Sequence, residues 1–258
     1  MIDKKITNDI GILMLDNPPQ NYLLEPEFIP VAELRKWIEE NHLKALVIAG
    51  SGRHFSGGAK LDSIFTMAEA VDPMEVRMEK GKELLTYLED LNIPVAAAIS
   101  GICFGGGLEI ALACHIRICS ENALFAFPET NQGLMPGLGG TFRLGEQLSL
   151  QDSLKMILGG DMINAEEALL LKVVDTIVKN EEPLPYTLHF LRKITEGRPL
   201  KIINYVMQTL QNVKRLPPEE SMREETRMFC DLAKIESNRR KNANNNEAGK
   251  ETEYCEEP

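Results

Sequence analysis

Two glutamates stand among apolar residues, where a charged side chain is costly unless it is paired or functional. Glu109 falls in the first turn of a predicted helix over 107–113 that is otherwise apolar, and Glu129 directly follows the segment Phe-Ala-Phe-Pro at 125–128. If both carboxyl groups share one partly dry pocket, their pKa values separate, so that one acts as a base and the other as an acid. Taken singly, Glu109 could instead complement a helix N-terminus, and Glu129 could be an exposed loop carboxylate.

Two glycine-bearing loops could supply a second chemical device. The predicted strands 45–49 and 95–99 each end in such a loop, and each loop opens a helix, near Ala59 and near Gly106. Backbone N–H groups in the first turn of a helix have no partner within the helix and carry a partial positive charge. Two of them converging on one oxygen would form an oxyanion hole. Tight turns that need only the permissive backbone of glycine are the alternative.

Several common nucleotide, nucleophile and metal motifs do not fit the sequence. The glycines at 105–107 and at 137–139 lack the third glycine of GxGxxG, and the segment 52–57 has P-loop spacing but continues with Gly58-Ala59 in place of Lys-Ser/Thr. No serine lies in a GxSxG elbow. The four histidines form no HExxH and the five cysteines no CxxC, so we expect no metal site and no disulfide framework.

The composition predicts a soluble cytoplasmic protein. The chain has 258 residues, 43% of them hydrophobic, and a formal net charge of −11. A surface of that sign repels phosphate backbones and anionic lipids, so nucleic acid and membranes are not expected partners. The uncharged stretch 93–108 is shorter than the ~20 residues of a membrane span. We expect no signal peptide at 1–16, and the cysteine usage suits a reducing compartment.

Strands that recur between helices predict an α/β fold with crossover connections. Residues 2–6 and 10–15 form a predicted hairpin, and further strands are expected at 45–49, 95–99, 116–119, 124–127 and 173–178. Helices are expected at 27–40, 73–91 and 107–113, and then, with no strand between them, at 185–195, 200–213 and 218–237. We therefore predict a core over 1–195, a helical region over 196–240 and a disordered polar tail over 241–258.

Four segments in the same order resemble the enoyl-CoA hydratase/isomerase, or crotonase, superfamily. They are HFSGGAKL at 54–61, ICFGGGLEIA at 102–111, IRICSENA at 116–123 and FPETNQGLMPGLGGTFRL at 127–144. The resemblance extends from Ile10 to about Val178 and is weaker through the C-terminal helices. It implies a spiral of ββα units with a C-terminal helical oligomerisation region, assembled as a homotrimer or a dimer of trimers, that binds an acyl-CoA thioester.

The resemblance also assigns roles to individual residues. Ala59 and Gly106 match the two oxyanion-hole positions, and Glu109 and Glu129 match the two catalytic glutamates of the hydratases. The stretch from Ala59 through Lys60, Leu61 and Asp62 matches the segment that lines the thioester, so these residues and Gly106 are the predicted substrate-binding residues.

The implied reaction is the reversible syn addition of water to a 2-enoyl thioester. As C3 is attacked, negative charge develops on the thioester oxygen, where the two N–H groups would stabilise it. One glutamate would deprotonate water and the other would protonate C2. No metal or redox cofactor is expected, because coenzyme A is part of the substrate.

Some positions depart from the family pattern and leave alternatives open. Lys60 stands where an aspartate is usual, as does His115, and the segment QNYLL at 20–24 replaces a common Asn-Ala-Leu run. A branched, cyclic or biosynthetic acyl group, including one on an acyl carrier protein, therefore remains an alternative to a straight fatty acyl chain. A double-bond isomerase that uses Glu129 alone, and a noncatalytic CoA-binding or RNA-binding module, are the other readings; the charge of −11 disfavours RNA.

Overall fold

The computed structural model describes residues 2–71 and 73–253, with the backbone alone for 243–253. The chain divides into two compact units, residues 1–198 and 199–258. The first unit contains all the strands and the first eight α-helices, and the second contains two long helices.

The main sheet of the first unit has six strands in the order β1-β2-β3-β4-β6-β9. The strands span Ile2–Thr7 (β1), Ile10–Leu15 (β2), Ala45–Gly50 (β3), Val95–Ile99 (β4), Ile116–Ser120 (β6) and Thr176–Val178 (β9). β1 and β2 form the predicted antiparallel hairpin, and every later pair is parallel. Because helices cover a parallel sheet on both faces, β3 and β4 are almost entirely buried, which explains their continuously apolar sequences.

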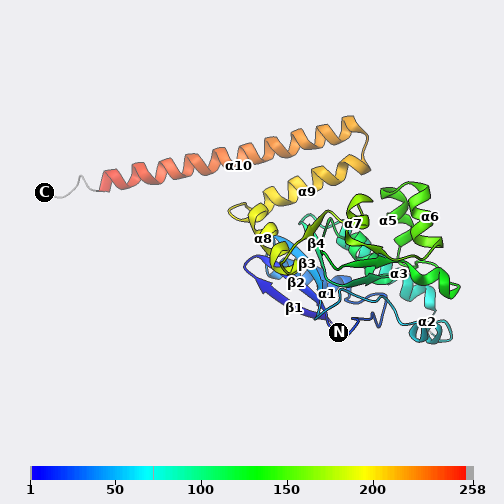
Figure 1. The fold of residues 1–258 in the computed structure, drawn as a ribbon. Coiled ribbons are helices and arrows are strands. Elements are labelled where there is room, and N and C mark those ends of the chain that lie inside the picture. Colours follow the sequence, from blue (N-terminus) through cyan, green and yellow to red (C-terminus); the bar gives the residue numbers. More distant parts are fainter. Residues whose placement is uncertain (1, 72, 254–258) are drawn as a thin grey trace. The chain divides into compact units, whose positions relative to one another are not determined.

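Helix α8 (Pro183–Thr195) packs against the main sheet (Figure 1). Leu191 is fully buried, and it lies in a cluster with residues of β2, β3 and β4, among them the small side chains of Ala45, Ala96 and Ala98. Alanine at these positions keeps the sheet surface flat, so that the leucines of the helix approach the strands closely. Helix α8 thereby covers one face of the sheet whose strands β3 and β4 lead into the two glycine loops.

A second sheet joins β5 (Ile102–Phe104), β7 (Leu124–Ala126) and β8 (Ile163–Asn164). β5 pairs with β7 in parallel, and β7 pairs with β8 in antiparallel fashion. The sequence predicted β7, but it described the three residues of β5 as part of a glycine loop. β5 forms nonetheless because Cys103 and Phe125, which are paired in register, are both fully buried.

The remaining helices of the first unit surround these sheets. They are α1 (Val31–Glu40), α2 (Leu61–Ala68), α3 (Met74–Glu89), α4 (Gly106–Ala113), α5 (Gly140–Gln147), α6 (Leu150–Leu158) and α7 (Ala165–Leu170), with a 3₁₀ turn, η1, over Pro128–Gln132. The sequence predicted α1, α3 and α4, and the helix expected to begin near Ala59 corresponds to α2. It predicted no element over 128–172, because the helices there are only about two turns long and carry too few periodic positions to be recognised.

The second unit consists of α9 (Leu200–Arg215) and α10 (Pro218–Glu253). The Tyr205 hydroxyl donates to Asp231 Oδ2 at 2.7 Å, and Lys201 Nζ lies 2.7 Å from the same oxygen, so one aspartate joins the two helices. Helix α10 includes the backbone of 241–253, part of the segment predicted as a disordered polar tail, although four asparagines and Gly249 there are weak helix formers. Disorder of the tail stays a prediction. Residues 254–258 of the predicted tail lie outside the described residues.

Within the part of the chain that the structure describes, no helix combines the length and apolar character that a membrane crossing requires. The α/β class and the C-terminal helical region are confirmed, with the boundary between the units three residues beyond the predicted one.

Gly81 on α3 and Gly145 on α5 differ in the space around them and so provide a test of the packing. A Cβ on Gly145 would meet nothing within 4 Å, whereas a Cβ on Gly81 would lie 2.6 Å from Pro26 Cβ and 2.8 Å from Leu138 Cδ2. We expect Gly145→Ala to raise the free energy of unfolding by about 0.5–1 kcal/mol, because alanine favours a helix over glycine. Gly81→Ala should lower it by about 1–3 kcal/mol through overpacking. Urea denaturation measures both, and shifts of the same sign would contradict the packing described.

Candidate active site

The loops after β3 and β4 meet at the carboxyl ends of these parallel strands. A Cβ on Gly58, whose φ is +78°, would lie 2.7 Å from Phe104 O and 3.1 Å from Gly106 N. Ser56 and Cys103 form a parallel bridge beside this contact. The two glycine loops predicted from the sequence therefore lie against each other, and glycine at 58 is required by both its backbone conformation and the lack of space.

Two buried polar residues hold the first of these loops. Asn21 Nδ2 donates to Ser51 O at 2.8 Å and to His54 O at 2.6 Å. Ser56 Oγ donates to Asn21 O at 2.8 Å and accepts from Gly58 N at 3.1 Å. The sequence analysis assigns no role to Asn21 or Ser56, because a single asparagine or serine in a loop carries no spacing signal. Their full burial and saturated hydrogen bonding indicate that they position the backbone that leads to Ala59.

Ala59 and Gly106, from the two loops, both line the same cavity. Neither of their N–H groups donates to another protein group among the described residues. Gly106 is the first residue of α4, so its N–H is one of those that a helix leaves without a partner. Two available donors on one cavity wall are what an oxyanion requires.

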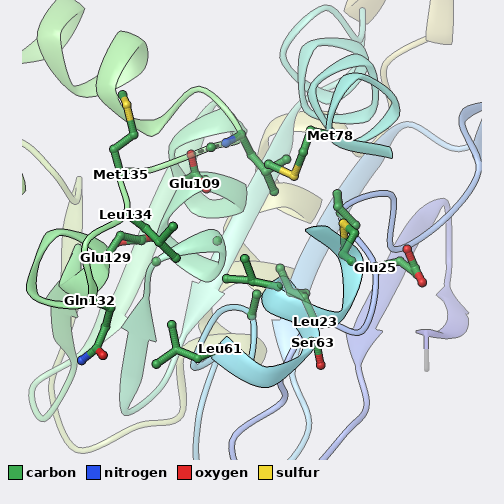
Figure 2. A pocket seen from close by; sticks show the side chains of 18 of the residues that line it. Leu23, Glu25, Leu61, Ser63, Met78, Glu109, Glu129, Gln132, Leu134 and Met135 are labelled. Carbon is green, nitrogen blue, oxygen red and sulfur yellow. Dashed lines mark hydrogen bonds between the residues drawn. The ribbon is translucent and has the colours of Figure 1, made fainter. Parts of the chain in front are cut away.

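The cavity has a volume of about 320 Å³ and is mainly apolar. Five of the predicted site residues line it: Ala59, Leu61, Gly106, Glu109 and Glu129. Figure 2 shows Glu109, Glu129 and Leu134 on one side of the cavity, with Leu23 and Leu61 across from them. Four methionines, Met67, Met74, Met78 and Met135, contribute to the remaining lining. The structure thus places both glutamates and both residues with available N–H donors on the lining of one cavity.

Lys60 and Asp62 do not line the cavity, although the sequence grouped them with the substrate-binding residues. Lys60 is exposed, and its Nζ lies 5.4 Å from the centroid of the Tyr22 ring. Asp62 is exposed in the first turn of α2, where a negative charge complements the helix N-terminus. A contact of these two residues with substrate remains a prediction.

Glu109 is held by backbone donors from the loop before α5. Its Oε1 accepts from Leu138 N and from Gly140 N, both at 2.7 Å, and only 2% of the residue is exposed. Burial raises the pKa of Glu109, while the backbone hydrogen bonds and the nearby Arg143 act in the opposite direction. The two donors therefore stabilise the charged carboxylate inside the cavity.

Arg143 fixes the loop that supplies those donors. Its Nη1 donates to Leu138 O at 3.0 Å and its Nε donates to Glu89 Oε2 at 3.1 Å, which joins α5 to the end of α3. Arg143 is 5% exposed, and its hydrogen bond to Leu138 O is buried, whereas the Glu89 side chain is partly exposed. The sequence did not single out Arg143, and its position within the segment 127–144 was the only available signal.

Glu129 is in a different environment from Glu109. Its Oε2 is buried with no hydrogen-bond partner among the described residues. Burial, with a smaller contribution from the charge of Glu109, raises the pKa of Glu129 from 4.5 to about 7. A Cβ on Gly105, whose φ is +51°, would lie 2.7 Å from Glu129 Oε1, so the glycine makes room for this carboxyl group.

Two histidines support the backbone at opposite ends of β4, His54 beside the loop that follows the strand and His115 at its first residue. His54 Nδ1 accepts from Ile102 N at 3.2 Å, and burial lowers the pKa of its ring. His115 Nδ1 accepts from Val95 N at 2.9 Å, and its Nε2 lies 3.0 Å from Glu89 O. In the described portion of the chain, no three His, Cys, Asp or Glu side chains are grouped so that they could hold a metal ion.

Known proteins match this chain along most of its length. Residues 5–251 match the model of the enoyl-CoA hydratase/isomerase family. A probable enoyl-CoA hydratase of Bacillus subtilis (strain 168) is 32% identical over 222 residues, which is 85% of each chain. The crystal structure of enoyl-CoA hydratase subunit I from Geobacillus kaustophilus HTA426 has 29% sequence identity and a TM-score of 0.77, and the match covers 96% of this chain and 95% of that one.

Some relatives are much longer proteins. The peroxisomal fatty acid beta-oxidation multifunctional protein AIM1 of Arabidopsis thaliana is 34% identical over 200 residues, which is 76% of this chain but only 28% of that protein. The match over almost the whole of the present chain shows its family: the protein belongs to the enoyl-CoA hydratase/isomerase, or crotonase, superfamily.

The raised pKa of Glu129 predicts a stability effect that depends on pH. The fold tolerates the neutral carboxyl group below pH 4.5, and the penalty for the buried charge develops between pH 4.5 and about 7. Glutamine carries no charge to bury. The free energy of unfolding of Glu129→Gln should therefore exceed that of the wild type by roughly 1–3 kcal/mol at pH 8, a range that allows for partial exposure, and by little at pH 4.5.

Thermal melts at the two pH values measure this difference. Glu146→Gln, at an exposed position on α5, controls for the loss of one negative charge. The burial argument would be contradicted if Glu129→Gln were stabilised equally at both pH values, or if Glu146→Gln were stabilised to the same extent.

Proposed function

We propose that the protein is an enoyl-CoA hydratase that adds water reversibly to the 2,3-double bond of an enoyl thioester, by syn addition. One observation carries this proposal. Two residues with available N–H donors and two carboxyl groups in different environments line the same apolar cavity. Membership of the family supports a thioester substrate. The hydratase name of a relative that this chain matches over 85% of its length supports the reaction.

The donors of Ala59 and Gly106 would hold the thioester oxygen. Water attack at C3 moves negative charge onto that oxygen, and two fixed N–H groups in an apolar cavity stabilise the resulting enolate. Loss of one such donor typically reduces the rate by ~10²–10³. Asn21, Ser56 and Gly58 contribute indirectly, because they hold the loop that aims the Ala59 N–H.

The environments of the two glutamates suggest how the roles are divided. Glu109 accepts two backbone hydrogen bonds that favour its charged form, so it is suited to orient water and take its proton. Glu129 has an unpartnered buried oxygen and a pKa of about 7, so it holds a proton that it can give to C2. In dehydration the same groups act in reverse, with Glu129 as the base.

A double-bond isomerase is the second candidate. Such an enzyme moves one proton between two carbons and can work with the carboxyl group at Glu129 alone. The unpartnered oxygen of Glu129 is compatible with that chemistry. The hydratase accounts for one more feature, the fixed and hydrogen-bonded Glu109 on the same cavity, and is therefore preferred.

The wider setting of the enzyme belongs to the same proposal. The described cysteines Cys103, Cys114, Cys119 and Cys230 are free thiols, which supports a reducing, cytoplasmic location. Exposed apolar residues on α9 and α10, among them Leu210, Val213 and Phe229, support a trimer or a dimer of trimers through the second unit. An acyl carrier protein in place of coenzyme A stays an alternative for the thioester carrier.

The division of roles is tested by removing each carboxylate. We expect Glu109→Gln and Glu129→Gln each to lower kcat for the hydration of crotonyl-CoA by at least ~10²-fold, since general acid and base catalysis contribute ~10²–10⁴ each. Absorbance of the enoyl thioester measures the rate. Undiminished hydration in both variants would overturn the mechanism. The second candidate would be favoured if the wild type hydrated no substrate but isomerised the double bond, and if Glu129→Gln lost this isomerase activity while Glu109→Gln kept it.

The raised pKa of Glu129 sets the expected pH profile. The active form of the Glu109–Glu129 pair holds one proton in total. Above about pH 7 the pair loses this proton, so kcat/KM should fall about tenfold per pH unit. Because hydration neither takes up nor releases a proton overall, dehydration must show the same fall. Stopped-flow or steady-state rates between pH 5.5 and 9 measure it. A flat profile between pH 6.5 and 9 would contradict the assignment.

A further inference from the structure

The cavity has an apolar end that begins beside the oxyanion donors. A Cβ on Gly106 would lie 3.1 Å from Leu23 Cδ1 and 3.9 Å from Leu138 Cδ1, so these two leucines stand next to the reacting atoms. Beyond them the lining consists of Pro26, Met67, Met74 and Met78. We call these six residues the tail end of the cavity. Methionine is flexible and fills irregular apolar space, so the tail end suits the hydrocarbon part of an acyl group.

Two chain segments form the walls of the tail end. One is the loop 23–26, and the other is the first half of α3, with Met74 and Met78. The walls touch at Gly81, where a Cβ would lie 2.6 Å from Pro26 Cβ. In Figure 2, Met78 and Glu25 lie on the side of the cavity away from Gln132 and Glu129. The walls are thus fixed at one point and continue toward the N-terminus of α3.

One turn before that point, an ion pair joins the two walls. Arg77 Nε donates to Glu25 Oε2 at 3.0 Å, and Arg77 Nη2 donates to Glu25 Oε1. Glu25 itself lines the cavity. A two-point pair of this kind fixes geometry as well as distance. It also occupies both oxygens of Glu25, so the tail end does not present a free carboxylate to the substrate.

The outer part of this side of the cavity is exposed. Leu24, Val71 and Val76 are exposed, whereas Leu23 and Pro26 are buried and hold the rest of the loop 23–26 in place. Without the pair, the exposed Glu25 side chain could move away from the first turns of α3 while Leu23 and Pro26 stay buried. The ion pair is therefore placed to decide how far the tail end extends.

We propose that the Arg77–Glu25 pair is the determinant of acyl chain length, with the closed pair limiting the substrate to short apolar tails. This rests on the proposed function, since it places the thioester at Ala59 and Gly106. Arg77 acts as a positioning residue through Glu25. A long tail would have to pass between the loop 23–26 and α3, which the closed pair prevents, and breaking the pair opens that path.

The test compares chain lengths within each variant. Trans-2-enoyl-CoA substrates of 4, 8, 12 and 16 carbons are assayed with the wild type, Glu25→Gln and Arg77→Gln. We expect the ratio of kcat/KM for the 12-carbon substrate to that for the 4-carbon substrate to rise at least fivefold in both variants, through KM. The exchange variant Glu25→Arg with Arg77→Glu should return the ratio toward that of the wild type. A general loss of folded enzyme would lower both rates and leave the ratio unchanged.

A matched control is provided by the Lys4–Glu33 pair, which joins β1 to α1 away from the cavity. Its side chains are 30% and 51% exposed, against 29% and 51% for Arg77 and Glu25. Glu33→Gln should leave the ratio within twofold of the wild type. An unchanged ratio in both Glu25→Gln and Arg77→Gln, or an equal change in Glu33→Gln, would overturn the proposal.

A binding measurement separates this proposal from the proposed function. Isothermal titration calorimetry gives the dissociation constants of butanoyl-CoA and dodecanoyl-CoA for the same variants. If the wild type hydrates none of the substrates, the proposed function fails, and the chain-length proposal is then decided by whether Glu25→Gln and Arg77→Gln improve dodecanoyl-CoA binding relative to butanoyl-CoA at least fivefold. No such improvement would overturn it.

Discussion

Burial of the Glu109 carboxylate removes it from water, and the two backbone hydrogen bonds at its Oε1 offset that cost. Much of the surrounding structure follows from this requirement. The donors come from a loop that Arg143 ties to Glu89, and a Cβ on Gly140 would lie 2.9 Å from Glu109 Cγ, so the loop can approach only as glycine. Burial still raises the pKa of Glu109, and the two hydrogen bonds oppose that rise, so they favour the charged form in a cavity where charge is most effective.

Glu129 shows the opposite solution within the same cavity. Its buried oxygen has no partner among the described residues, and the group responds by retaining a proton up to about pH 7. The difference between the two glutamates is therefore a difference in backbone donors. Glu109 receives two N–H groups from a neighbouring loop, whereas Glu129 has a backbone hydrogen bond within its own residue and the space that Gly105 leaves. Chemistry that needs an acid and a base obtains both from a single residue type.

The sequence predicted the groups that react better than the groups that hold them. Glu109 and Glu129 were recognisable because charge among apolar residues is conspicuous, and Ala59 and Gly106 because two strands ended in similar loops. Asn21, Ser56 and Arg143 act through partners 30 or more residues away or through backbone atoms, and such contacts leave no local pattern. Lys60 and Asp62 illustrate the reverse, since adjacency in sequence grouped them with Ala59 and Leu61, whereas the turn into α2 directs them away from the cavity lining.

The free thiols described above are unequally placed, and this has a practical consequence. Cys103, Cys114 and Cys119 are buried, and burial raises the pKa of each, to about 12 for Cys114 and Cys119. Alkylating reagents attack the thiolate, so these three resist them, whereas Cys230 on α10 is exposed. With Cys255 replaced, a maleimide dye or a nitroxide spin label would attach to α10 alone. The native cysteine would then report the distance between neighbouring copies in an assembly while the catalytic cavity remains unmodified.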